Sequence, residues 1–329
     1  MARAESEGWL ALLALDRLAS PGAPTHDIAD VAALADTDED RLRRLWRAVG
    51  FPDVPDGLAV YTDADVEAAR RLMHGGFARR SDFSTVLRHV RVISSSMSRV
   101  ASLLADYYGD EVRDLRARGL SDEAAAYAIV EDFDGDELAA LVVHAARLQL
   151  RAAFWRRLGR DLVPETAVAV GFADLSGYTQ LSAALDADRL ADFVARWEAV
   201  AYDTVAQHGG RVVKTIGDEV MFVGLSLQVA RTAIALRDGA QAHELPAVRS
   251  GIAAGMVVAR DGDFYGPVVN LASRLTEIAS AGTIYASDAV HEQLVGVPSL
   301  VWSEVGPREL RSIGSVAVFS LLGESETST

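Results

Sequence analysis

The sequence of 329 residues contains no cysteine, a single lysine and no long apolar run. Without cysteine the chain forms neither disulfide bonds nor thiolate metal sites, which fits a reducing compartment. No segment reaches the roughly 18 apolar residues that a membrane-spanning helix needs. Residues 1–20 have too short an apolar segment for a signal peptide and are expected to form an amphipathic helix. We therefore expect a cytoplasmic protein that does not span a membrane.

Positive charge is also scarce. There are 47 acidic residues against 32 basic ones, and the formal net charge is −15 at pH 7. This balance disfavours nonspecific binding to nucleic acid or anionic lipid, because both would be repelled. All of the basic residues except Lys214 are arginine. Lys214 lies four residues before Asp218. Either this lysine has no specific role, or its site requires a compact cation with three hydrogen-bond donors.

The first 160 residues show the periodicity of apolar residues that is typical of helices. Apolar residues recur at i, i+3, i+4 and i+7, and strand-like alternation is nearly absent. Segments rich in proline and glycine at 20–24 and 51–57 are expected to be loops. We therefore expect an all-helical domain over residues 1–160, whose last helix, from about 137 to 160, leads into the second half.

From residue 161 the pattern changes to alternating strands and helices. The expected elements are strands over 166–175, 211–216, 219–225 and 248–259, and helices over 178–210 and 227–243. Gly217-Asp218 is a two-residue hairpin signal between two of these strands. A further helix and two strands follow. The order βαββαβ, with appended elements, is typical of a ferredoxin-like α+β fold.

Two carboxylates stand at the ends of predicted strands. Asp174 ends the first apolar strand and Asp218 lies at the hairpin tip. Side chains at strand ends and hairpin tips of one sheet commonly cluster. Two carboxylates a few ångströms apart require a raised pKa or a bound cation. Since the chain offers oxygen ligands and no cysteine, the fitting ion is Mg²⁺ or Mn²⁺. From the residues alone, both could equally serve as turn formers.

Three segments resemble the motifs of class III nucleotidyl cyclases, in the same order and at similar separations. They are FADLSGYTQLS (172–182), VVKTIGDEVMF (212–222) and DFYGPVVNLASRL (263–275). The resemblance covers about residues 165 to 322 and implies a ferredoxin-like α+β catalytic domain over 161–329. It also implies an adenylate cyclase, in which the ribose 3′-hydroxyl of ATP attacks its own α-phosphate to give 3′,5′-cyclic AMP and pyrophosphate.

The resemblance assigns roles to individual residues. It implies that Asp174 and Asp218, with the backbone carbonyl of Leu175, hold two Mg²⁺ or Mn²⁺ ions. Asn270 and Arg274 are four residues apart on a predicted helix and so share one face. The resemblance implies that Asn270 orients the ribose and that Arg274 stabilises the charge on the transferring phosphate.

The resemblance also implies how the base is recognised. Lys214 would donate to N1 of adenine, and Asp263 would accept from its exocyclic amine. Guanine presents the reverse pattern, so ATP is favoured over GTP, and a guanylyl or relaxed-specificity cyclase is the less favoured alternative. Arg311 is a further candidate for a phosphate contact. In this family the metal carboxylates of one subunit face the other groups of its partner, which implies a symmetric homodimer.

The N-terminal half carries two looser resemblances. Residues 25–52 resemble a helix-turn-helix of the MerR kind, with Thr37 and Asp40 as a capping pair for its second helix. Acidic residues at that helix start disfavour DNA binding, and a DNA-binding regulator with a nucleotide-sensing C-terminal domain is the alternative function. The architecture resembles actinobacterial adenylyl cyclases with a helical N-terminal autoinhibitory domain, a group associated with activation by mild acidity. His89 and His144 are then the candidate pH-sensing residues.

Overall fold

The computed structural model describes Leu10, Ala14 and residues 22–161 and 168–325. Apart from Leu10 and Ala14, the helix expected over residues 1–20 lies outside the described residues. The chain divides into two compact units, Met1–Trp155 and Arg156–Thr329. The helix expected over 137–160 is α8 (Gly135–Asp161), and it crosses this division.

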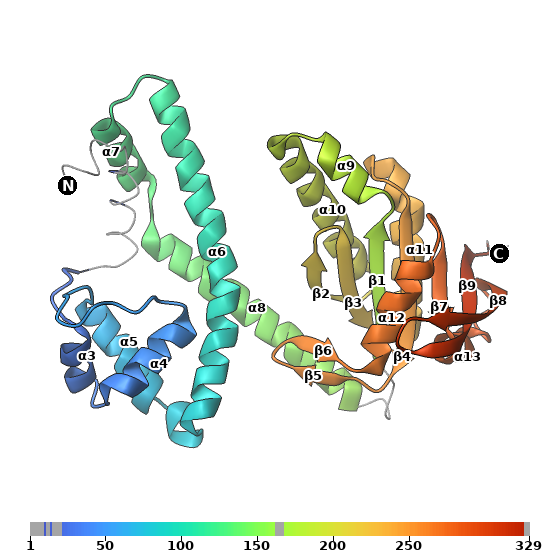
Figure 1. The fold of residues 1–329 in the computed structure, drawn as a ribbon, viewed down its shortest axis with the longest axis horizontal. Coiled ribbons are helices and arrows are strands. Elements are labelled where there is room, and N and C mark those ends of the chain that lie inside the picture. The colour runs from blue at the N-terminus through green and yellow to red at the C-terminus, as the bar shows by residue number, and fades with distance from the viewer. Residues whose placement is uncertain (1–9, 11–13, 15–21, 162–167, 326–329) are drawn as a thin grey trace. The chain divides into compact units, whose positions relative to one another are not determined.

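The first unit is helical (Figure 1). Besides α8, its elements are α3 (Ile28–Leu34), α4 (Glu39–Val49), α5 (Asp63–His74), η1 (Ala78–Arg80), α6 (Phe83–Ala117) and α7 (Asp122–Asp132). Helices α3, α4 and α5 and the start of α6 share a core of buried apolar residues that includes Val31, Leu42 and Leu45. A smaller cluster around Ile129 joins α6 and α7. The helical periodicity of the sequence thus corresponds to observed helices.

The capping pair expected for α4 is wrong. The N-cap residue is Asp38, whose side chain accepts a hydrogen bond from the backbone N of Arg41 at 2.8 Å. Asp36 adopts a left-handed conformation with φ of 52°, which a short polar side chain tolerates. That residue lengthens the turn after α3, so the helix begins one residue later than the pairing of Thr37 with Asp40 would require.

The second unit is built on a seven-stranded sheet in the order β2-β3-β1-β4-β7-β9-β8. Its strands are β1 (Val168–Leu175), β2 (Arg211–Ile216), β3 (Glu219–Gly224), β4 (Val248–Gly255), β7 (Ile284–Ser287), β8 (Leu300–Leu310) and β9 (Gly314–Glu324). A separate ribbon pairs β5 (Val258–Arg260) with β6 (Asp263–Tyr265). The helices are α9 (Tyr178–Ala184), α10 (Ala187–Gln207), α11 (Ser226–Gly239), η2 (Ala240–His243), α12 (Pro267–Ile278) and α13 (Asp288–Leu294). The chain order from β1 to β4 confirms the ferredoxin-like α+β class.

Alternation along the strands gives the sheet two covered faces. Ala169 and Ala173 of β1 belong to the core shared with α10, α11 and α13. Val170 and Phe172 belong to the core shared with α12 and β6. Because successive side chains of a strand point to opposite faces, one apolar strand serves both cores. Figure 1 shows the helices of the second unit packed along the sheet.

Two expected elements are interrupted. The helix expected over 178–210 is two helices, because Leu185 is extended and Asp186 caps α10 by accepting from the backbone N of Arg189 at 2.9 Å. The strand expected over 248–259 ends at Gly255, whose φ is 155°, and the chain then enters the β5–β6 ribbon. In both places a local backbone conformation that periodicity does not reveal redirects the chain.

Candidate active site

The two carboxylates predicted to cluster lie together at one end of the sheet. Asp174 lies near the end of β1, and the register pairs Ala173 with Val220, so the β2–β3 turn lies beside it. The side chains of Asp174 and Asp218 lie within hydrogen-bonding reach of each other. The indole Nε1 of Trp197 on α10 donates to the backbone O of Asp218 at 2.9 Å and so fixes the turn.

Negative charge is crowded at this point. Burial, and then the hydrogen bond and charge of Asp174, raise the pKa of Asp218 to about 6. Burial, and then the charges of Asp174 and Asp218, raise the pKa of Glu219 to about 7. Such crowding favours a bound cation. No group of three or more His, Cys, Asp or Glu side chains in the described part of the chain is arranged to hold a metal ion. The candidate ligands are thus two carboxylates and a backbone carbonyl such as that of Leu175, all of them oxygen donors that suit a hard divalent ion.

Arg249 is a residue of this site that the sequence reasoning missed. It lies on β4 directly opposite Asp174, and its Nε donates to Oδ2 of that carboxylate at 2.6 Å. Its Nη1 also donates to the backbone O of Glu277 at 3.3 Å, at the end of α12. An arginine inside an otherwise apolar strand, as in VRSGIAAG, is the signal that could have identified it.

Lys214 and Asp263 form a pair across two strands. The Nζ of Lys214 on β2 lies 2.6 Å from Oδ2 of Asp263 on β6. The other oxygen of Asp263 accepts from the backbone N of Phe264 at 2.7 Å. Burial opposes ionisation of Asp263, but the hydrogen bond from Lys214 holds its pKa below the ordinary value. The structure therefore brings together two residues that are 49 positions apart.

Asn270 and Arg274 lie one turn apart on α12, as expected. Asn270 is exposed, and Arg274 is partly exposed and paired with Glu277, which raises the pKa of the guanidinium. Among the described residues, no hydrogen bond or ion pair joins either of them to the Asp174–Asp218 pair or to the Lys214–Asp263 pair. Within one chain the predicted site residues thus form three separate groups.

Arg311 lies apart from these groups, in the exposed turn between β8 and β9. The register through β4, β7 and β9 places this turn at the end of the sheet where β1 begins, whereas Asp174 lies where β1 ends. The structure therefore does not bring Arg311 to the carboxylates of its own chain.

The two candidate pH-sensing histidines both lie in the first unit. His89 is exposed on α6, with Nδ1 2.7 Å from the backbone O of Thr85 and its ring edge-on to Phe77. His144 is exposed on α8 and is not a core residue. In the described part of the chain, no helix is long and apolar enough to cross a membrane.

Two kinds of solved cyclase structure are similar to about half of this chain. The adenylyl cyclase CyaB of P. aeruginosa is 23% identical, with a TM-score of 0.44, and the match covers 49% of this chain and 96% of that one. The catalytic core of a rhodopsin-guanylyl cyclase with converted specificity, in complex with ATPαS, is 21% identical with a TM-score of 0.46, and the match covers 49% of this chain and 97% of that one.

Sequence comparison identifies the family. Residues 162–323 match the adenylate and guanylate cyclase catalytic domain. An adenylate cyclase of Streptomyces coelicolor is 35% identical over 257 residues, which cover 77% of this chain and 67% of the relative. A pH-sensitive adenylate cyclase of Mycobacterium tuberculosis is 32% identical over 296 residues, covering 86% and 74% of the two chains. The chain therefore belongs to the adenylate and guanylate cyclase family and is a class III adenylyl cyclase.

Proposed function

We propose that this cytoplasmic enzyme converts ATP to 3′,5′-cyclic AMP and pyrophosphate at two sites shared between the subunits of a homodimer. The observation that carries the choice of ATP is the contact of 2.6 Å between Lys214 and Asp263. It supplies one cationic donor and one carboxylate acceptor side by side, in a chain that has no other lysine. The names of the actinobacterial relatives support the same choice.

The Lys214–Asp263 pair is suited to reading the edge of adenine. Adenine offers an acceptor at N1 and a donor at its exocyclic amine, and guanine offers the reverse. An ammonium donates to the first group and a carboxylate accepts from the second. Guanine would set its N1–H donor against the ammonium and its O6 acceptor against the carboxylate, which disfavours a guanylyl or relaxed-specificity cyclase. When adenine binds, it replaces part of the contact that the two side chains now make with each other.

Asp174 and Asp218 are proposed to hold two Mg²⁺ or Mn²⁺ ions, with the backbone carbonyl of Leu175 as an additional ligand. Divalent ions bound there would lower the pKa of the ribose 3′-hydroxyl and neutralise charge on the triphosphate. The oxygen-only donors and the crowding around Asp218 support this assignment. Arg249, which lies against Asp174, adds a fixed positive charge beside the place proposed for the phosphates.

Asn270 and Arg274 are proposed to act on the sugar and the α-phosphate. In the reaction the 3′-oxygen bonds to the α-phosphorus, the bond from that phosphorus to the pyrophosphate oxygen breaks, and the hydroxyl proton leaves to solvent. Asn270 would orient the ribose by hydrogen bonds. Arg274 would exchange its ion pair with Glu277 for the oxygens of the α-phosphate, where negative charge builds up in the transition state.

A shared site would explain why the groups are separate in one chain. No hydrogen bond or ion pair joins the Asp174–Asp218 pair to Asn270, Arg274 or Lys214 among the described residues. A single subunit supplies every group but not one assembled site. A second copy, related by a two-fold axis, would bring one subunit's carboxylates to the other subunit's Lys214, Asn270 and Arg274 and form two equivalent sites.

Mixing two inactive variants tests the shared site. Asp174→Ala and Asn270→Ala should each lose cyclic AMP production, and the mixed sample should regain part of it. The reason is that a heterodimer has one site with both substitutions and one site with neither. Production is measured before and after mixing, with circular dichroism and sedimentation as controls for folding and dimerisation. Folded, dimerising variants that show no recovery would contradict the shared-site model.

The DNA-binding alternative has little support in the first unit. The four arginines of α4 are already engaged. Arg43 pairs with Asp56, Arg47 pairs with Asp53, and Arg41 and Arg44 lie over the ring of Phe83. These contacts leave α4 without the free basic surface that phosphate contacts need. We propose instead that this unit inhibits the cyclase and relieves the inhibition in mild acid, which the pH-sensitive relative supports.

A further inference from the structure

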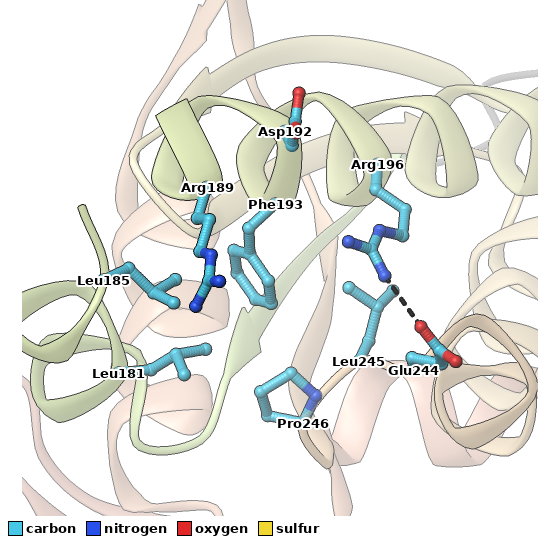
Figure 2. A pocket seen from close by; sticks show the side chains of 9 residues that line it. All are labelled: Leu181, Leu185, Arg189, Asp192, Phe193, Arg196, Glu244, Leu245 and Pro246. Atoms are coloured by element: carbon cyan, nitrogen blue, oxygen red, sulfur yellow. Dashed lines mark hydrogen bonds and ion pairs between the residues drawn. The ribbon is translucent and has the colours of Figure 1, made fainter. Parts of the chain in front are cut away.

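A pocket of about 440 Å³ lies on the second unit, and none of the proposed catalytic residues lines it (Figure 2). Its walls come from α9, from α10 and from the segment that precedes β4. The apolar part of its lining is formed by Leu181, Leu185, Phe193, Leu245 and Pro246. The volume falls within the range of about 300–1,000 Å³ that is usual for small-molecule sites.

Two arginines line this pocket beside its apolar residues. Arg189 and Arg196 are seven residues apart on α10 and therefore share a face of the helix. Figure 2 shows both arginine side chains directed into the pocket, whereas the side chain of Asp192 points away from it. Arg196 is bound to Glu244 at 3.1 Å. Among the described residues, Arg189 forms a longer ion pair, 3.7 Å to Asp186, and its side chain is 76% exposed. Arg189 therefore retains donors that an anion can use.

We propose that this pocket binds a small amphiphilic anion, with one carboxylate, sulfonate or phosphate group on an aromatic or other apolar body. The apolar body would pack against Phe193, which is itself stacked on Tyr178 at 6.1 Å between centroids. The anionic group would bind Arg189. An inorganic anion would leave the apolar lining uncovered, and a neutral apolar molecule would make no use of the Arg189 guanidinium, so each fits the pocket less well.

The pocket walls are linked to the carboxylate pair by hydrogen bonds. Just before α9, the backbone N of Ser176 donates to the backbone O of Ala247 at 2.9 Å, and Ala247 directly precedes β4. On α10, Trp197 follows Arg196 and donates to the backbone O of Asp218. A ligand that shifts these walls would therefore shift the carboxylates, and we propose that occupancy changes the Mg²⁺ dependence of turnover. This second part rests on the proposed function.

The test uses the full chain and the fluorescent anion 8-anilinonaphthalene-1-sulfonate. We expect saturable binding that Arg189→Gln weakens by about fivefold or more, because the charge-assisted hydrogen bond is lost. Glu244→Gln should strengthen binding, because it releases Arg196. Arg308→Gln, which removes an exposed arginine of β8 outside the pocket, should leave the affinity unchanged. Circular dichroism checks that each variant folds.

Three results would overturn the proposal for binding. One is equal weakening by Arg189→Gln and Arg308→Gln. Another is binding of the neutral analogue N-phenyl-1-naphthylamine that is as tight as that of the anion and insensitive to Arg189→Gln. The third is displacement of the fluorescent anion by a similar concentration of inorganic phosphate, which would reveal an anion site without an apolar part. If the anion binds but the Mg²⁺ dependence of turnover does not change in a way that requires Arg189, only the proposed coupling is refuted. If the chain produces no cyclic AMP even without added anion, the result counts against the proposed function instead.

Discussion

The most specific single residue in the site is Lys214, the only lysine of the chain. Its ammonium lies 2.6 Å from Asp263, and its side chain is 36% exposed, so it is a partnered group and not a freely solvated one. An arginine would be bulkier, and its planar guanidinium presents several donors in a fixed arrangement, whereas N1 of adenine accepts a single hydrogen bond. The compact cation is thus a physical requirement of the proposed base-reading role.

Lys214→Arg tests that role. We expect kcat/KM for ATP to fall by about 10- to 100-fold, because a buried polar group of the base or of Asp263 loses its partner. Turnover of GTP should not rise. Steady-state kinetics with both nucleotides measure this, and Arg308→Lys, an exchange of an exposed cation on β8, is the control. An ATP value within about twofold of the unchanged protein would refute the role.

The raised pKa values of Asp218 and Glu219 predict how metal binding depends on pH. Because their pKa values are about 6 and about 7 in the folded chain, both groups bind more protons folded than unfolded. Their contribution to the stability of the metal-free protein therefore falls as the pH rises from about 4 through about 7. Divalent ions compete with those protons, so the ions should stabilise little near pH 5 and much more near pH 8.

Thermal unfolding with and without Mg²⁺ or Mn²⁺ across that pH range measures the effect. Asp218→Asn should reduce both the metal-induced rise in Tm and its dependence on pH. A metal effect of the same size near pH 5 and near pH 8 would contradict the assignment of this carboxylate pair to metal binding.

At the scale of elements, the position of α12 depends on a glycine of β4. A Cβ on Gly251 would lie 2.3 Å from the backbone O of Ala272 and from the backbone N of Thr276. Real Cβ atoms do not approach backbone atoms so closely, so any side chain there would push α12 away from the sheet. Since α12 carries Asn270 and Arg274, this close packing also sets where those two side chains lie.

Gly251→Ala should therefore destabilise the second unit by about 1–3 kcal/mol and lower turnover as well. Urea unfolding and cyclic AMP production measure the two effects. Gly239→Ala is the matched control, because a Cβ at that position has nothing within 4 Å. Equal stability of the two variants would mean that the strand and the helix can separate at little cost.

At the scale of the whole molecule, two units with separate cores are joined by a continuous helix, α8. A helix that leads from the unit proposed to be inhibitory into the catalytic one is an element suited to transmitting a change of state. The two candidate pH-sensing residues, His89 on α6 and His144 on α8, are both exposed.

Deletion of residues 1–155 tests the inhibitory role of the first unit. We expect the truncated enzyme to turn over faster at neutral pH and to respond less to acid, because the element that restrains it is gone. Cyclic AMP production from about pH 5.5 to pH 8 is compared with that of the full chain. A folded, dimeric truncated enzyme that is no faster near neutral pH would argue against autoinhibition.

The sequence by itself determined the class of each half, the alternation of strands and helices from β1 to β4 and the three cyclase motifs. These features are encoded locally, in the periodicity of apolar residues and in short runs such as the Gly217-Asp218 turn. Even the spacing of Asn270 and Arg274 follows from helix geometry alone. Local patterns of this kind are sufficient to propose the motif residues.

Only the tertiary structure decided which residues meet. The ion pair of Asp174 with Arg249 follows from the register of β1 on β4, and the contact of Lys214 with Asp263 follows from the approach of the β5–β6 ribbon to β2. The break at Leu185, which helical periodicity did not reveal, creates the corner between α9 and α10 where the pocket lies. The register of the strands, the position of the ribbon and the corner between the helices all depend on packing between distant segments. A local sequence pattern does not contain that information.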